Sequence, residues 1–111
     1  MIISCNKTNN IVENTISKEL DSVNYWINFS KHKTTDFQNK SITLEKAYKL
    51  TKSIISDSIQ NILLAEISIE TEKYNIDDLF IKVNSESLEL ATKRNDFYKM
   101  GDAHWNYGNY Y

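Results

Sequence analysis

Residues 43–73, TLEKAYKLTKSIISDSIQNILLAEISIETEK, contain no glycine, proline or tight-turn dipeptide. Apolar side chains and one threonine recur there at steps of three and four residues, which is the spacing of one helix face. These residues are Leu44, Tyr48, Thr51, Ile55, Ile59 and Ile62. Thr43 is a good N-cap, and Glu45 places a carboxylate in the first turn, where it favours the positive end of the helix dipole. We therefore predict one continuous helix over residues 43–73.

The end of this stretch has a second interpretation. EISIETEK, starting at Glu66, alternates apolar and polar residues, which is typical of a strand, and DLFIKV at residues 78–83 could pair with it. We prefer the continuous helix because nothing in residues 43–74 would turn the chain. A small α+β hairpin over residues 66–83 is the alternative.

A first helix is predicted over residues 10–31. Apolar residues recur at helical spacing from Val12 to Ile27, and Asn10 can cap the start. The polar, aperiodic segment KHKTTDFQNK follows. We therefore expect residues 32–42 to form the longest loop of the chain.

A third helix is predicted over residues 75–100. Asn75 can serve as its N-cap, acidic residues fill its first turn, and Gly101 is a plausible C-terminal stop. Residues 101–111 would then form an aromatic tail. We find no internal repeat. The predicted fold is all-α: residues 1–111 form a single domain, an antiparallel bundle of three or four helices.

The composition limits the class of protein. The 111 residues are 41% hydrophobic and 25% charged, which is ordinary for a globular protein and argues against general disorder. Two glycines and no proline are too few for the turns of an all-β domain. A net charge of −2 argues against a general nucleic-acid binder.

The expected location is the cytoplasm. Cys5 is the only cysteine, so no intrachain disulfide can form, and a reducing compartment is the simplest setting. The sequence does not start with a secretory leader, and no apolar run approaches the roughly 18 residues that a membrane span requires. Frequent Ile, Asn and Lys beside a single arginine suggest an AT-rich, bacterial or phage gene.

The sequence offers little catalytic chemistry. It has no metal-binding motif, no phosphate-binding loop and no nucleophile elbow, so we expect neither a cofactor nor a metal. Small helical RNases of the HEPN type have an arginine and a histidine separated by four to six residues on one helix. Arg94 and His104 have nine residues between them and do not match that spacing. We expect the protein not to be an enzyme.

Two features of the sequence suggest a protein partner. Residues 53–92 hold eight acidic residues against two lysines, and six aromatic residues follow within residues 97–111. A field of one sign attracts partners of the other sign, and Tyr and Trp are common interface hot spots. The predicted partner-binding residues combine both features. They are Glu66, Glu70, Asp77, Asp78, Trp105, Tyr107, Tyr110 and Tyr111.

In size, surface character and composition the chain resembles the immunity proteins that bacteria co-express with nuclease toxins. The resemblance implies a non-catalytic, antitoxin-type protein that blocks a basic toxin domain encoded nearby. We expect neither a nucleic acid nor a membrane as the partner. One alternative is a regulatory or nucleic-acid-associated helical protein that uses a basic patch, Lys31–Lys52, which contains six lysines and two acids. The other is a structural or phage protein that self-associates through its aromatic tail.

Overall fold

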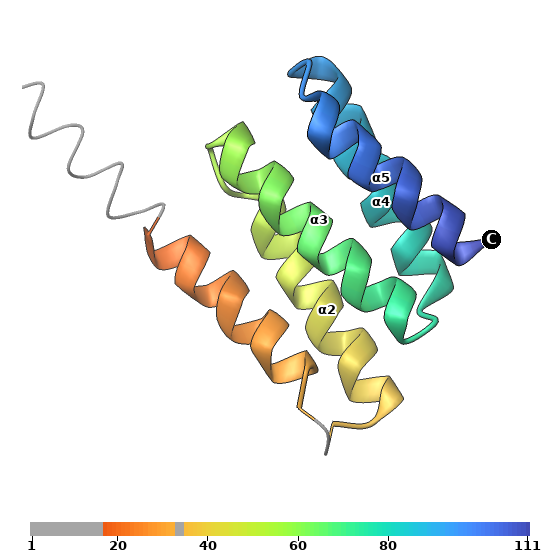
Figure 1. The fold of residues 1–111 in the computed structure, drawn as a ribbon. Helices are drawn as coiled ribbons and strands as arrows, with labels where there is room; N and C mark the ends of the chain where they lie inside the picture. Colours follow the sequence, from red (N-terminus) through yellow and green to blue (C-terminus); the bar gives the residue numbers. More distant parts are fainter. Residues whose placement is uncertain (1–16, 33–34) are drawn as a thin grey trace, which may run out of the picture.

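The computed structural model describes residues 17–32 and 35–111, and this part of the chain is helical with no strand (Figure 1). It contains five helices. A first helical segment covers residues 17–30, and the four that follow are α2 (Phe37–Lys52), α3 (Asp57–Lys73), α4 (Asp77–Lys93) and α5 (Phe97–Tyr110). The all-helical prediction is confirmed. The hairpin alternative over residues 66–83 is wrong, because that segment spans the end of α3 and the start of α4. The predicted N-cap Asn10 lies outside the described residues.

The helix predicted over residues 43–73 is two helices, because the chain turns at residues 53–56. Ser56 is the N-cap of α3, and its hydroxyl accepts a hydrogen bond from the Ile59 amide at 3.3 Å. Gln60 Nε2 donates to the Thr51 carbonyl at the end of α2, at 3.1 Å. The turn thus needs no glycine or proline, since a serine cap and a glutamine that reaches back satisfy its backbone groups.

The start of α2 lies before Thr43, the predicted N-cap. Asp36 is the observed N-cap, and its side chain accepts a hydrogen bond from the Asn39 amide at 2.8 Å. Thr43 lies inside α2, where its hydroxyl donates to the Asn39 carbonyl at 2.9 Å. The loop predicted over residues 32–42 is therefore wrong from residue 37 onward. The segment lacks apolar periodicity because the first turn of α2 is mostly exposed.

The helix predicted over residues 75–100 is also two helices. Asn75 and Asn95 have φ angles of 56° and 55°, the left-handed conformation that ends many helices. In both links the amide of the following residue donates to the carbonyl five residues back, at 2.9 Å, as in a Schellman motif. Asn75 therefore ends α3 and is not the N-cap of α4.

Residues 101–111, predicted to be an aromatic tail, are helical up to Tyr110. Asp96 caps this helix, α5, and its side chain accepts a hydrogen bond from the Lys99 amide at 3.1 Å. Gly101 is not a helix stop, because it lies inside α5 and neither glycine of the chain has a positive φ.

The four named helices begin at equal intervals. Their first residues are 37, 57, 77 and 97, each 20 residues after the one before. One buried position recurs at the same interval from the first segment to α5. These side chains, at most 4% exposed, are Val23, Thr43, Leu63, Val83 and Ala103. The structure is thus a helical repeat whose residue identities vary too much for the repeat to be visible in the sequence.

The predicted helical bundle is confirmed, but the described residues form five helices and not three or four, and these helices pack as a zigzag array. Each one packs on the next helix and on the one after it, α2 on α3 and α4, and α3 on α4 and α5. The chain therefore alternates between two layers, and α5 lies in front of α4 in Figure 1. The first segment packs on α2 through Val23 and Ile27. Contacts between near neighbours are typical of helical repeat proteins.

Candidate partner-binding surface

Buried amide side chains fix α4 between its neighbours. Asn61 Nδ2 in α3 donates to the Ser87 carbonyl in α4 at 3.3 Å. Asn84 Nδ2 in α4 donates to the Ala103 carbonyl in α5 at 3.0 Å, and Asn106 Nδ2 donates to Asn84 Oδ1 at 3.3 Å. A buried amide without partners is costly, so these hydrogen bonds select one register of α5 on α4. That register decides where the aromatic side chains of α5 lie.

The end of α5 packs on the start of α4 through aromatic rings. The Phe80 ring is fully buried. Tyr110 stacks on it with 4.8 Å between ring centroids, and Tyr107 meets it edge-on at 5.9 Å. Tyr111 is exposed and contacts both tyrosines, with its centroid 4.9 Å from that of Tyr110 and 6.5 Å from that of Tyr107. Two of the predicted partner-binding residues therefore pack on one buried ring, and a third, Tyr111, packs on those two.

Two of the predicted carboxylates lie beside these rings. Asp77 and Asp78 are exposed in the first turn of α4, the helix that also carries Phe80. Desolvation raises the pKa of the Tyr110 hydroxyl, and the negative charges of Asp77 and Asp78 raise it further. We call the group formed by Asp77, Asp78, Tyr107, Tyr110 and Tyr111 the acidic–tyrosine cluster.

The remaining three predicted residues lie outside this cluster, two on α3 and one on α5. Glu66 is exposed on α3. Glu70 is only 7% exposed, and its Oε2 has no hydrogen-bond partner within the described residues. Trp105 is exposed on α5, about 140–160° around the helix axis from Tyr107 and Tyr110. Trp105 and the tyrosines therefore belong to different faces of α5.

Sequence reasoning missed the outer face of α5, the side that carries Trp105. Phe97 and Tyr98 are exposed on this side, and so are Gly101 and Gly108. Their spacing of three and four residues was the available signal. This spacing predicts one helix face only if the helix continues through Gly101, which was predicted to end it.

The basic patch Lys31–Lys52 is partly used inside the fold. Lys40 is buried, and its Nζ donates to the carbonyls of Ser30 at 2.6 Å and His32 at 3.0 Å. A lysine at this position satisfies the free carbonyls at the end of the first helical segment and opposes the negative end of its dipole. Lys40 therefore stabilises the fold and is not available to a phosphate backbone.

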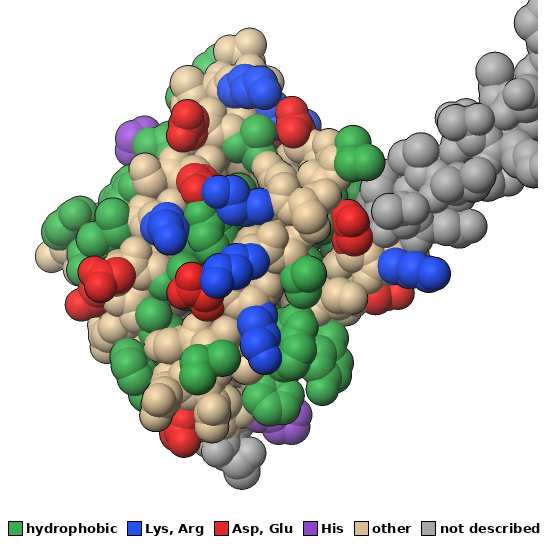
Figure 2. Space-filling view, turned by 180° about the vertical axis from the view of Figure 1, so that it is seen from behind, with side chains coloured by type: hydrophobic (Ala, Val, Ile, Leu, Met, Phe, Trp, Pro, Cys, Tyr) green, Lys and Arg blue, Asp and Glu red, His purple; other side chains and the backbone are tan. Residues whose placement is uncertain are grey.

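Other lysines of the patch have partners of their own. Lys46 Nζ lies 4.6 Å from the centroid of a Trp26 ring, and Lys49 Nζ lies 3.9 Å from a carboxylate oxygen of Glu45. Figure 2, which views the molecule from behind, shows lysines and acidic side chains interspersed on that face. The alternative of a nucleic-acid surface is weakened, because such binding depends on unpaired positive charge.

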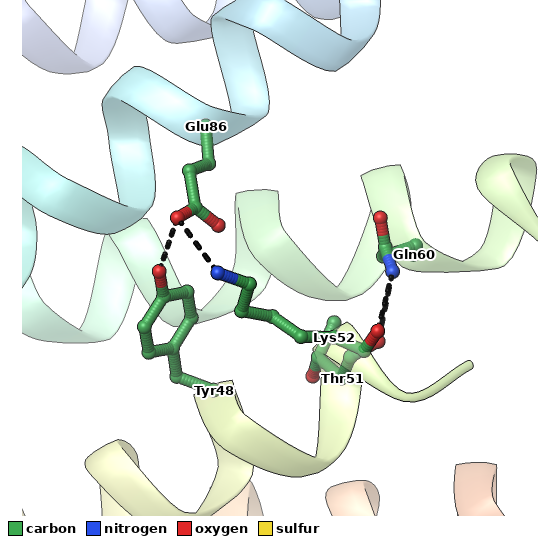
Figure 3. Close-up of polar contacts among 5 residues, drawn as sticks. All are labelled: Tyr48, Thr51, Lys52, Gln60 and Glu86. Atoms are coloured by element: carbon green, nitrogen blue, oxygen red, sulfur yellow. Dashed lines mark hydrogen bonds and ion pairs between the residues drawn. The ribbon is translucent and has the colours of Figure 1, made fainter.

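A polar contact between α2 and α4 was also missed (Figure 3). The buried Tyr48 hydroxyl donates to Glu86 Oε1, and Lys52 Nζ lies 3.2 Å from the same oxygen. A shallow hollow of about 270 Å³ lies beside this contact. Its lining residues are Lys52, Gln60, Leu64, Glu86, Glu89, Leu90 and Lys93. Two lysines and two glutamates balance in charge, so the hollow has no clear preference for an anion or a cation.

Within residues 17–32 and 35–111, no three His, Cys, Asp or Glu side chains are grouped so that they could hold a metal ion. None of the helices described above is long and apolar enough to cross a membrane. No protein-family model, no curated protein and no solved structure matches this chain.

Proposed function

We propose that this protein is a non-catalytic protein-binding domain whose acidic–tyrosine cluster binds a basic surface of its partner. The observation that supports this function is the position of Asp77 and Asp78 beside tyrosine rings that are already ordered on Phe80. Rings ordered before binding lose little conformational entropy when a partner arrives. Exposed carboxylates next to them attract a basic partner and orient it.

The partner that we propose is a basic nuclease toxin domain encoded nearby, which makes this chain an immunity or antitoxin protein. The mechanism is steric and electrostatic. Asp77 and Asp78 would occupy positions in the toxin cleft that otherwise hold substrate phosphates, and Tyr110 and Tyr111 would pack against the rim. Glu66, exposed on the neighbouring helix, would add to the attraction at longer range.

The test is co-purification with the product of the adjacent gene, followed by calorimetric titration at low and high salt. We expect Asp78→Lys to weaken binding by about tenfold or more, because it places a positive charge against a basic surface. Glu89→Lys is the matched control, since it makes the same charge change on an exposed residue of the same helix, α4. Its effect should stay within about threefold.

Equal effects of Asp78→Lys and Glu89→Lys would contradict the proposal, and so would binding that is indifferent to salt. A gel shift with mixed DNA and RNA distinguishes the proposed function from the main alternative, which is nucleic-acid binding. Retardation of nucleic acid by the purified chain, without any protein partner, would favour the basic patch instead.

A further inference from the structure

One lysine of this chain shows how a tyrosine ring and a carboxylate hold a cation together (Figure 3). Lys52 Nζ lies 3.2 Å from a carboxylate oxygen of Glu86 and 5.4 Å from the centroid of the Tyr48 ring. The Tyr48 hydroxyl donates to the same carboxylate oxygen. The charge of the carboxylate and the negative face of the ring both attract the ammonium group. A tyrosine beside an acidic side chain can therefore hold a cation, and here the chain itself supplies that cation.

The acidic–tyrosine cluster has the same chemical groups without a cation. Asp77 and Asp78 are exposed, and their charges act on the Tyr110 hydroxyl. Within the part of the chain that the structure describes, no lysine or arginine forms an ion pair with these two carboxylates or lies over a ring of the cluster. By contrast, Asp102 on α5 forms an ion pair with Lys99 at 3.8 Å. The cluster thus attracts a cation that the described residues do not supply.

The tyrosine rings of the cluster are ordered before any partner binds. Tyr110 stacks on the buried Phe80 ring, with 4.8 Å between the ring centroids. Tyr111 is 88% exposed and meets Tyr110 edge-on, with an angle of 82° between the two ring planes. Because Phe80 covers one face of Tyr110 while Tyr111 is almost fully exposed, Tyr111 offers the ring face that an incoming cation can reach.

We propose that the acidic–tyrosine cluster binds an arginine side chain of the partner, with the guanidinium group stacked on the Tyr111 ring and hydrogen-bonded to Asp77 or Asp78. This arginine site rests on the proposed function, in which the partner is basic. Arginine fits better than lysine, because its planar guanidinium group stacks on an aromatic face and can donate two parallel hydrogen bonds to one carboxylate. The guanidinium group is also more weakly hydrated than an ammonium group, so it loses less hydration when it contacts a ring.

Two short peptides of equal charge test the preference for arginine in the full chain. Acetyl-Gly-Arg-Gly-amide and acetyl-Gly-Lys-Gly-amide are titrated separately while NMR follows the backbone amides of the protein. The net charge of −2 attracts both peptides equally, so a difference between them reports the site. We expect the arginine peptide to bind about three- to fivefold more tightly, with a Kd of about 1–10 mM, and to shift the amides of residues 76–80 and 107–111.

Substitutions in the cluster separate the role of the ring from that of the carboxylates. Tyr111→Leu keeps an apolar side chain but removes the ring, so it should abolish the preference for arginine over lysine. Its control is Tyr98→Leu, because Tyr98 is an equally exposed tyrosine of α5 outside the cluster. Asp78→Asn should weaken binding of both peptides by about threefold or more. Its control is Glu89→Gln, which removes an exposed charge elsewhere on α4 and should change binding by less than about twofold.

Equal affinity of the wild-type chain for the two peptides would overturn the arginine site. Peptide binding that Tyr111→Leu and Asp78→Asn leave unchanged would also overturn it, and so would the absence of saturable binding up to about 50 mM peptide. Co-purification with the adjacent gene product tests the proposed function separately. If that partner binds but the chain does not prefer arginine, only the arginine site is wrong. If the chain prefers arginine but no basic partner binds, only the proposed function is wrong.

Discussion

Asn75 and Asn95 take the chain through a backbone conformation that most side chains adopt only at a cost. Their φ angles of 56° and 55° place them in the left-handed region. Asparagine tolerates this region better than most residues, because its short polar side chain can form local hydrogen bonds. The two links between α3, α4 and α5 therefore depend on these residues more than on any glycine.

Replacing Asn75 should separate backbone strain from side-chain loss. We expect Asn75→Ala to lower the free energy of unfolding by about 1 kcal/mol, because the left-handed conformation is unfavourable for alanine. The free energy of unfolding of Asn75→Gly should equal or exceed that of the wild type, because glycine adopts the left-handed conformation without strain. Urea unfolding of both variants measures the difference. The control is Asn39→Ala, an exposed asparagine inside α2 that should lose nothing. Equal losses at residues 75 and 39 would refute the account.

Asn75 marks a helix boundary that the sequence alone could not assign to one helix. Asparagine is favoured both before a helix and after one, so the sequence marks residue 75 as a boundary without saying of which helix. Its role became clear only from the hydrogen bonds of the link. Gly101 was misjudged for a related reason. Glycine suits a helix end, but Asp96 caps a new helix before Gly101 is reached.

One polar contact, from Tyr48 and Lys52 to Glu86, joins α2 to α4 across the array. Burial, then the hydrogen bond to Glu86 and its charge, raise the pKa of the Tyr48 hydroxyl well above its ordinary value of 10.0. A group whose pKa rises on folding keeps its proton longer in the folded state than in the unfolded state. Its contribution to stability is complete below pH 10 and is lost as the pH rises further.

We therefore expect Tyr48→Phe to respond to pH differently from the wild type. At neutral pH it should be less stable by about 1 kcal/mol, because the hydrogen bond to Glu86 is lost. Between about pH 10 and pH 12 the wild type should lose up to about 1.4 kcal/mol more per pH unit than Tyr48→Phe. Chemical denaturation across this range measures both effects. Tyr98→Phe, at an exposed position, is the control, and its free energy of unfolding should change with pH as that of the wild type does. If the free energy of unfolding of Tyr48→Phe changed with pH as that of the wild type does, the prediction would be contradicted.

The contact between α4 and α5 depends on buried amides. We expect Asn84→Ala to lower the free energy of unfolding by about 2–4 kcal/mol, because it leaves the Ala103 carbonyl and the Asn106 amide without this partner and opens a cavity. Thermal unfolding measures the loss. Ser85→Ala, one residue along but exposed, should change stability by less than about 0.5 kcal/mol. If Asn84→Ala left the free energy of unfolding unchanged, the buried amides would not be what fixes this contact.

Elements were predictable from periodicity, but their ends and faces were not. The break at residues 53–56 depends on Gln60 reaching back to α2, which no local pattern indicates. The direction of each α5 side chain depends in turn on where that helix begins. Asp77 and Asp78 lie beside Tyr110 although they belong to another helix, whereas Trp105 lies on another face of α5 than Tyr107 and Tyr110.

The molecule as a whole has an extended core that runs from the first segment to α4, and its helices contact only near neighbours along the chain. Each of α2 to α5 packs on at most two helices in either direction along the chain, and the first segment packs on α2. Stability in such a structure is close to a sum of local terms and contacts between adjacent repeats. The two edges of the array should therefore be able to open independently of each other.

Hydrogen exchange of the full chain tests this independence. Asn106→Ala removes a contact between α5 and α4, so it should speed exchange in α5 by about tenfold and leave residues 17–30 unchanged. Val23→Ala is the reciprocal variant. It opens a cavity where the first segment meets α2, and it should speed exchange there without affecting α5. If either variant instead accelerated exchange uniformly along the chain, the molecule would unfold as one cooperative unit, and the description as an array of repeats with separable edges would be wrong.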